Sequence, residues 1–156
     1  MLFRSVVGLG YDMGMFSLAA TGSYDSRDDI IGLERGGFAG MLRGDVKFND
    51  RASVFAMLLY GENSSGYTTW ANGNDDENTF SVIAGGSVAL TDKATFNVQG
   101  QWVQGNNGLD DPWSLAANVA YNLVPGLTIT PELDSVDFGN AGGDAFGARL
   151  RVQRSF

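Results

Sequence analysis

Apolar and polar residues alternate along most of this chain, and the alternation is strictest over residues 144–156. In an extended strand, Phe146, Leu150 and Val152 lie on one face of this segment, and Arg149 and Arg151 lie on the other. A strand with an apolar face and an arginine face separates two different media. In a soluble sheet these media are a protein core and water, whereas in a membrane barrel they are lipid and an aqueous lumen.

The same two-residue period recurs from end to end and predicts about nine strands in a meander. The expected strands are 3–11, 15–25, 38–48, 52–61, 79–90, 94–104, 113–123, 127–138 and 144–156. Residues 38–48 are the clearest interior strand, because Arg43, Asp45 and Lys47 alternate with apolar positions. Residues 52–61 are apolar on both faces, and Pro131 lies within 127–138, where proline is normally confined to an edge strand or a bulge.

The connections between the expected strands alternate in length. Short turns follow the first, third, fifth and seventh strands, and long polar loops follow the second, fourth, sixth and eighth. Three of the short turns are expected to pair apolar residues across a hairpin: Phe48 with Ala52, Leu90 with Ala94, and Leu123 with Leu127. The even-numbered residues of 52–61 then join the apolar face. This pattern, with aromatics near the strand ends, is typical of an outer-membrane barrel and favours it over a soluble all-β sandwich or barrel with an aromatic core.

Composition narrows the function classes. The chain has 22 glycines and 3 prolines, which suits a sheet protein, and its net charge of -8 argues against nucleic acid as a partner. It has no cysteine and no histidine, so we expect neither an enzyme nor a metal or other cofactor. No run of about 18 apolar residues is present, so a membrane-spanning form has to be a barrel. The first residues lack the continuous apolar stretch of a secretory signal, and we expect no signal peptide here.

Three segments, 90–99 (LTDKATFNVQ), 117–133 (ANVAYNLVPGLTITPEL) and 148–156 (ARLRVQRSF), resemble the general diffusion porins of alpha-proteobacterial outer membranes. The resemblance spans essentially the whole chain and is to the C-terminal half of such a porin. It implies a transmembrane barrel of sixteen strands, a homotrimer when full-length, through which ions and small hydrophilic solutes diffuse passively. We therefore interpret residues 1–156 as a single part of a β-barrel, partial or closed into a small barrel.

The resemblance also implies partners. These are outer-membrane lipid, lipopolysaccharide and the outer-membrane assembly machinery, in a bacterial outer membrane that the chain crosses many times. Phe156 matches the C-terminal aromatic that the assembly machinery reads, and with Leu150 and Val152 it forms the expected assembly signal. Arg154 interrupts the apolar alternation there, and we place it at the headgroup level, where arginine can reach water.

The polar face supplies the candidate functional residues, because charged side chains in a pore bias which ions enter. The expected pore-lining residues are Arg4, Arg43, Asp45, Lys47, Lys93, Asn97, Gln99, Gln101, Asn118, Glu132, Asp134, Arg149, Arg151 and Gln153. Each could instead be a solvated side chain of the wall with no effect on conduction.

Two arginines stand out on this face. If the loop after residue 138 closes in simple antiparallel register, Asp134 lies opposite Arg149 and Glu132 lies opposite Arg151. Such cross-strand pairs would organise the wall, each contributing roughly 0.2–1 kcal/mol. Neutralising both arginines is expected to move ion selectivity toward cations.

Two alternatives stay open at this point. The chain could form a small closed outer-membrane barrel with a filled interior and a structural or adhesion role. Left open, the first and last strands expose unpaired edges in lipid, so we expect closure between them, self-association or failure to insert. Acidic residues at 75–77 and 110–111 could bridge divalent cations to lipopolysaccharide, but no spacing matches a calcium loop, and a solvated loop is the favoured interpretation.

Overall fold

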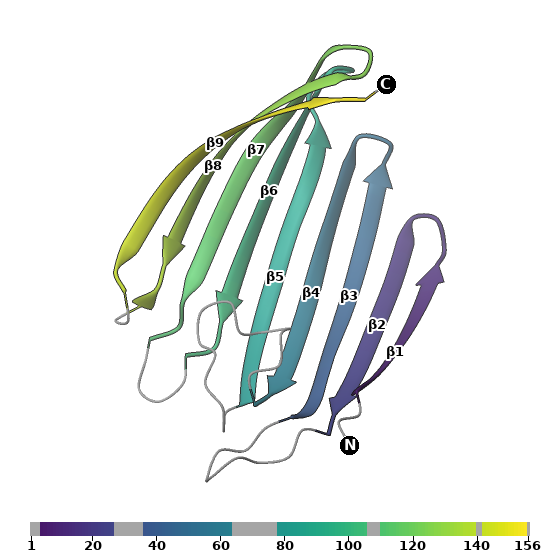
Figure 1. The fold of residues 1–156 in the computed structure, drawn as a ribbon. Coiled ribbons are helices and arrows are strands. Elements are labelled where there is room, and N and C mark those ends of the chain that lie inside the picture. Colours follow the sequence, from purple (N-terminus) through teal and green to yellow (C-terminus); the bar gives the residue numbers. More distant parts are fainter. Residues whose placement is uncertain (1–3, 27–35, 64–77, 106–109, 140–141, 156) are drawn as a thin grey trace.

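The computed structural model describes residues 4–26, 36–63, 78–105, 110–139 and 142–155. Its strands form one antiparallel sheet in which each strand pairs with the next along the chain (Figure 1). They are β1 (Arg4–Asp12), β2 (Phe16–Asp25), β3 (Gly37–Asn49), β4 (Ala52–Glu62), β5 (Asn78–Ala89), β6 (Ala94–Val103), β7 (Trp113–Val124), β8 (Leu127–Asp137) and β9 (Asp144–Arg154). The predicted all-β meander of nine strands is confirmed. No helix in the described ranges is long and apolar enough to cross a membrane.

The sheet is curved, so it has a concave inner face and a convex outer face. The short connections β1–β2, β3–β4, β5–β6 and β7–β8 all lie at one end of the strands, and the long connections lie at the other (Figure 1). Long connections thus follow every second strand, as the sequence predicted. We call the two ends of the sheet the turn end and the loop end.

The outer face is a continuous apolar surface because the strand registers keep apolar residues in phase. Across β3 to β6, Leu42 lies opposite Leu58, Leu58 opposite Val82, and Val82 opposite Trp102. Apolar side chains on this face are widely exposed, up to 76% for Leu9 on β1 and 74% for Phe146 on β9. Patches of this extent on an isolated soluble protein would promote aggregation, whereas in lipid they are stabilising.

An aromatic row follows the loop end of the outer face. Tyr24 and Phe38 have ring centroids 4.8 Å apart, and Phe80 and Trp102 have centroids 6.4 Å apart. The indole N–H of Trp102 donates to Asp111 Oδ2 at 3.1 Å, so the ring has an apolar body and a polar tip. This is the girdle geometry that the sequence predicted for strand ends.

Burial excludes the soluble sandwich. The described residues form a single sheet with no second layer, and apart from Pro112 before β7 their buried apolar side chains are Ala39, Leu59 and Val103. All three point to the inner face near the loop end. The large aromatics of the outer face are therefore not a core, and Trp113 on that face is 41% exposed.

Two of the expected hairpin partners are wrong by one position. The bodies of the hairpins have the predicted register, with Val46 opposite Val54 and Tyr121 opposite Ile129, but Ala52 lies opposite Asn49 and Leu127 opposite Val124. A bulge therefore sits beside each turn. At the first turn the Asn49 side chain accepts N–H bonds from the backbone of residues 51 and 52 at 2.8 and 2.9 Å. At the other, Gly126 adopts a φ of 77°, which glycine tolerates without strain.

Pro131 lies inside the sheet and not at an edge. It sits opposite Leu150 of β9, while the pairing of β8 with β7 passes from Glu132 opposite Asn118 to Ile129 opposite Tyr121 with no paired residues between. The ladder is interrupted where proline has no N–H to donate.

The first and last strands do not meet. In the part of the chain that the structure describes, β1 pairs only with β2 and β9 only with β8. Because every strand is antiparallel to the next, β1 and β9 run in the same direction. Of the forms expected from the sequence, the structure has the partial barrel, and closure of β1 on β9 is not present.

Candidate functional site

The inner face carries the polar side chains of the sheet, and we call it the inner wall. The predicted pore-lining residues that lie on this face of the strands are Arg4, Arg43, Asp45, Lys47, Asn97, Gln99, Gln101, Asn118, Glu132, Asp134, Arg149, Arg151 and Gln153. Lys93 lies in the turn between β5 and β6, where its carbonyl accepts the N–H of Asn122 at 2.8 Å. It belongs to the rim of the turn end and not to a strand of the wall.

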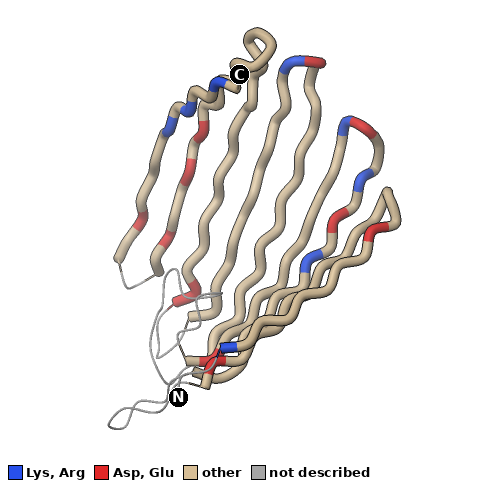
Figure 2. Tube along the Cα trace, turned by 45° about the vertical axis from the view of Figure 1, so that its right-hand side comes forward, with Lys and Arg blue, Asp and Glu red and all other residues tan. Residues whose placement is uncertain are grey.

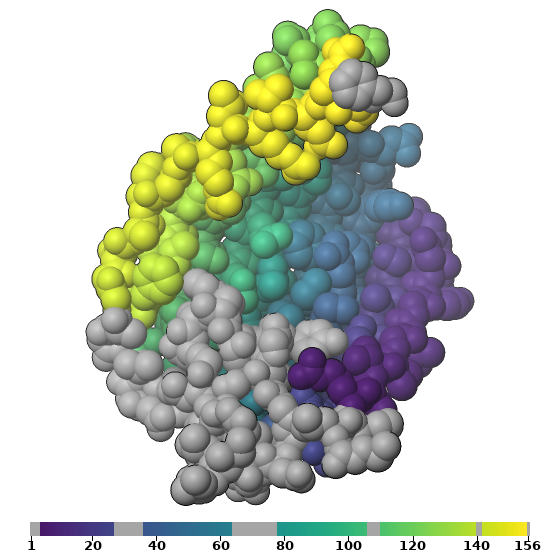
Figure 3. All heavy atoms as spheres, viewed as in Figure 1, coloured from purple at the N-terminus to yellow at the C-terminus, as the bar shows by residue number. Residues whose placement is uncertain are grey.

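A hollow of about 580 Å³ lies in the middle of the inner wall. Seven strands line it, and the central strands form its floor (Figure 3). The predicted residues that it brings together are Arg43, Asp45, Asn97, Gln99, Asn118, Glu132 and Arg149. The strand registers thus gather residues that are far apart in the sequence.

A chain of hydrogen bonds crosses this wall from β6 to β9. Asn97 Nδ2 donates to Asn118 Oδ1 at 2.8 Å, and Asn118 Nδ2 donates to Glu132 Oε2 at 3.1 Å. Arg149 Nε then lies 3.3 Å from Glu132 Oε1. Each contact joins residues directly opposite one another in adjacent strands, so the network ties four strands together at one level.

The register of β8 with β9 differs from the prediction by two residues. Glu132 lies opposite Arg149, and Arg151 lies opposite Thr130. The expected contact of Asp134 with Arg149 is present diagonally, at 3.1 Å between Asp134 Oδ1 and Arg149 Nη2. The expected contact of Glu132 with Arg151 is absent, because Glu132 is directed to Arg149. Within the described residues Arg151 has no carboxylate at ion-pair distance.

Arg43 on β3 is held on two sides. Its Nε donates to Asp45 Oδ2 at 2.8 Å and its Nη2 donates to Asp45 Oδ1 at 2.7 Å, a two-point fork. Its guanidinium carbon lies 4.4 Å from the ring centroid of Phe55. Sequence reasoning missed Phe55, although the apolar residues on both faces of 52–61 were a signal. Its place opposite Asp45 depends on the β3–β4 register.

Charge is distributed unevenly along the inner wall. Figure 2 shows charged residues on β3 and on β8 and β9, with uncharged strands between them. Within the strands β4, β5, β6 and β7 themselves, the only charged residue is Glu62, which is at the loop end of β4 and in phase with the outer-face residue Tyr60. The middle of the wall is uncharged and combines polar side chains of β5 to β7 with the apolar Phe55, Met57 and Leu59 of β4. Alternating charges lie on its two sides.

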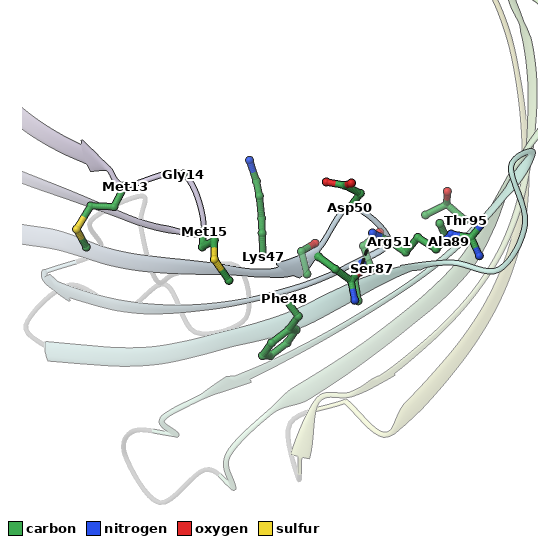
Figure 4. A pocket seen from close by; sticks show the side chains of 13 residues that line it. Met13, Gly14, Met15, Lys47, Phe48, Asp50, Arg51, Ser87, Ala89 and Thr95 are labelled. Atoms are coloured by element: carbon green, nitrogen blue, oxygen red, sulfur yellow. Dashed lines mark hydrogen bonds between the residues drawn. The ribbon is translucent and has the colours of Figure 1, made fainter.

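A second hollow, of about 940 Å³, lies at the turn end next to the β3–β4 turn. Figure 4 shows that Lys47 and Asp50 point to one side of the sheet and Phe48 to the other. Lys47 lies opposite Ser53, and no carboxylate lies at ion-pair distance from it in the described ranges. At the rim, Arg51 Nη2 lies 3.2 Å from Asp92 Oδ1 in an exposed pair.

The remaining predicted residues lie toward the ends of the wall. Arg4 Nη2 contacts Asp25 Oδ2 at 2.6 Å across β1 and β2 at the loop end. Gln101 Nε2 donates to the buried Ser81 Oγ at 3.1 Å. Gln153 lies opposite Thr128 near the turn end.

The segment expected to carry the assembly signal lies on the outer face. Leu150 and Val152 are exposed there, opposite Pro131 and Ile129. Phe156 falls outside the described residues.

Of the two acidic segments, only residues 110–111 lie in the described part of the chain. Residues 75–77 fall outside the described part of the chain. Asp111 is engaged by the protein itself, since its Oδ1 accepts the N–H of Gly105 at 2.8 Å and its Oδ2 accepts the indole of Trp102. Among the described residues, no group of three or more carboxylates is placed to hold a metal ion.

The chain matches a known protein family and is similar to several known proteins. A family model described as Porin subfamily matches residues 3–152. Porin Omp2a of Brucella canis is 38% identical over 160 residues, which cover 97% of this chain and 39% of the relative. Porin Omp2a of Brucella abortus is also 38% identical and is covered to 44%, and Porin Omp2b of Brucella neotomae is 36% identical and covered to 39%. The chain therefore spans about two fifths of the length of these relatives.

Proposed function

This chain belongs to the Porin subfamily, and from that premise we propose that it forms part of the wall of a water-filled channel in a bacterial outer membrane. Ions and small hydrophilic solutes would diffuse passively through this channel. Family membership supports a channel and not an enzyme. Residues 1–156 would act as one continuous part of the barrel.

The observation that carries this proposal is the division of one curved sheet into two faces. The outer face is apolar and exposed across successive strands, as contact with lipid requires. The inner wall is polar and lines a hollow, as contact with water requires. The outer face therefore requires lipid, and the inner wall requires water.

The candidate residues then have roles in permeation. We infer that the charges of β3 and of β8 and β9 face ions in the lumen, and that the middle strands form an uncharged part of the wall between them. The network from Asn97 to Arg149 supports a further inference, that part of this charge holds the wall together and only the rest acts on ions.

Partners follow from the same faces. We infer contact of the outer face with membrane lipid and lipopolysaccharide, with Leu150, Val152 and Phe156 read by the outer-membrane assembly machinery. A homotrimer of the full-length protein is also part of the proposal. It rests on the resemblance of the sequence to general porins, since the structure holds one copy.

The alternative of a small closed barrel with a filled interior has weaker support. Closing β1 on β9 would make a parallel pair in an otherwise antiparallel sheet, because both strands run in the same direction.

Single-channel recording tests the proposal. The full chain is refolded into detergent, checked for heat-modifiable migration, and added to planar bilayers in KCl. We expect discrete current steps whose size follows the conductivity of the bulk salt, because the lumen is filled with water. Heat-modifiable migration without current steps would instead indicate a closed and filled barrel.

A further inference from the structure

Phe55 is an aromatic residue of β4 on the inner wall, where it lines the central hollow. On the inner wall it lies directly opposite Asp45 of β3 and Gly85 of β5. Its ring occupies the space that a side chain at residue 85 would need, since a Cβ there would lie 2.7 Å from Phe55 Cε1. The same Cβ would lie 2.6 Å from the Val98 carbonyl oxygen, so the backbone of β6 also leaves no room for a side chain at residue 85. The ring is therefore positioned by the absence of a side chain at Gly85.

The ring in turn supports the guanidinium of Arg43. The distance of 4.4 Å from the guanidinium carbon to the ring centroid is that of a cation–π contact. Asp45 holds the same group by its edge through Nε and Nη2. The Phe55 ring and the Asp45 carboxylate together fix the plane and the position of the Arg43 guanidinium.

Fixation leaves part of the guanidinium free. A guanidinium has five N–H donors, and the fork to Asp45 engages the donors on Nε and one on Nη2. The Arg43 side chain is 36% exposed, and within the described ranges its polar contacts are all to Asp45. The free donors lie in a plane, at a spacing that matches the two oxygens of a carboxylate, so each N–H can bond its own oxygen. Chloride is a single atom and has to share both donors in a bent geometry.

The other arginines of the wall lack this combination. Arg149 is engaged by two carboxylates, with Nε 3.3 Å from Glu132 Oε1 and Nη2 3.1 Å from Asp134 Oδ1. Arg151 is exposed, and in the described part of the chain no carboxylate holds it. Arg4 is held at the loop end by one carboxylate oxygen, with Nε 3.1 Å and Nη2 2.6 Å from Asp25 Oδ2. Among the described inner-wall residues, Arg43 is the arginine that is held by both a two-point carboxylate fork and an aromatic ring and that keeps free donors.

We propose that Phe55 is a positioning residue for Arg43, and that the fixed Arg43 makes the channel favour planar oxyanions such as carboxylates over chloride. This inference rests on the proposed channel function. It assigns a role in selectivity to an uncharged side chain, whose substitution leaves the charge of the lumen unchanged.

The test measures the permeability ratio of acetate to chloride, from reversal potentials with potassium acetate on one side of the bilayer and KCl on the other. Phe55→Leu should lower this ratio by about two-fold, the order expected from loss of an exposed cation–π contact. Phe55→Tyr keeps the ring and should retain the ratio. Met57→Leu is the matched control, because Met57 is the next inner-wall residue on β4 and lies opposite Arg43.

A double-mutant cycle separates positioning from a general disturbance of the wall. Arg43→Gln should lower the ratio at least as far as Phe55→Leu, and in the Arg43→Gln background Phe55→Leu should have no further effect. Phe55→Met provides the same readout if the leucine variant does not fold. An unchanged ratio in Phe55→Leu, or an equal loss in both backgrounds, would overturn the inference. Absence of any wild-type channel would overturn the proposed function instead.

Discussion

Val98→Arg should destabilise the folded protein in lipid vesicles by about 2–4 kcal/mol, the cost of an arginine on the lipid face near the middle of a transmembrane barrel strand. Val98 lies midway along β6 on the outer face, opposite Gly86 and Ala117. It has no polar neighbour on that face, so a guanidinium there would lose its water without gaining a partner. Equilibrium unfolding in urea, followed by tryptophan fluorescence, measures the change.

The adjacent residue provides a matched control. Gln99→Arg introduces the same side chain one position along β6 but on the inner wall, where Gln99 is exposed and lines the hollow. We expect its stability to stay within about 0.5 kcal/mol of wild type, as for most substitutions at solvated positions. Equal losses for the two variants would mean that the faces are not lipid and water.

Arg149→Gln should lower stability by about 1 kcal/mol, the sum expected for two partly exposed ion pairs. It should also move the reversal potential in a KCl gradient toward the K⁺ equilibrium potential, as expected for greater cation selectivity. Both effects arise because Arg149 lies between Glu132 and Asp134, and its removal leaves two carboxylates facing the lumen without a cation. Urea unfolding and reversal potentials give the two readouts.

Arg151→Gln removes the same charge from the neighbouring inner-wall position and serves as the comparison. Because Arg151 lies opposite Thr130, we expect the shift toward cations with little change in stability. The double variant should shift selectivity further than either single one. If Arg149→Gln and Arg151→Gln lost the same stability, the network across β6 to β9 would not hold the wall as described.

The alternation of the sequence was sufficient to predict the strands and their faces. Residues two apart share a face, so apolar positions in 38–48 and 94–104 determine which side meets lipid without any knowledge of partners. The short turns extended this to 52–61, where both faces are apolar. The inner position of Phe55 is a direct consequence of that assignment.

The register of β8 with β9 could not be predicted in the same way. A slip of two residues leaves every side chain on its own face, so alternation is equally consistent with Arg149 opposite Asp134 or opposite Glu132. Hydrogen bonds at the two ends of the β8–β9 connection determine which register forms. Asp137 Oδ1 accepts the N–H of Gly139 at 2.7 Å, and the Phe138 N–H bonds the Gly143 carbonyl at 3.2 Å, so that Asp137 pairs with Asp144.

Contacts between residues on different strands could not be predicted from the sequence for the same reason. Phe55 meets Arg43 and is seated by Gly85 only because three strands share one register. The bulges beside the turns also depend on local chemistry, on the Asn49 side chain at one turn and on the positive φ of Gly126 at another. The two-residue period of the sequence predicts neither the contacts of Phe55 nor the bulges.

The division into a lipid face and a water face is the central claim, and cysteine accessibility tests it most directly. The chain has no cysteine, so Val98→Cys and Gln99→Cys each introduce a single thiol on β6. A charged, membrane-impermeant methanethiosulfonate reagent is added to the protein in lipid vesicles and to channels in planar bilayers. We predict that Gln99→Cys reacts and loses conductance, while Val98→Cys reacts only after unfolding. Equal reaction of both thiols, or reaction at residue 98 alone, would contradict the account.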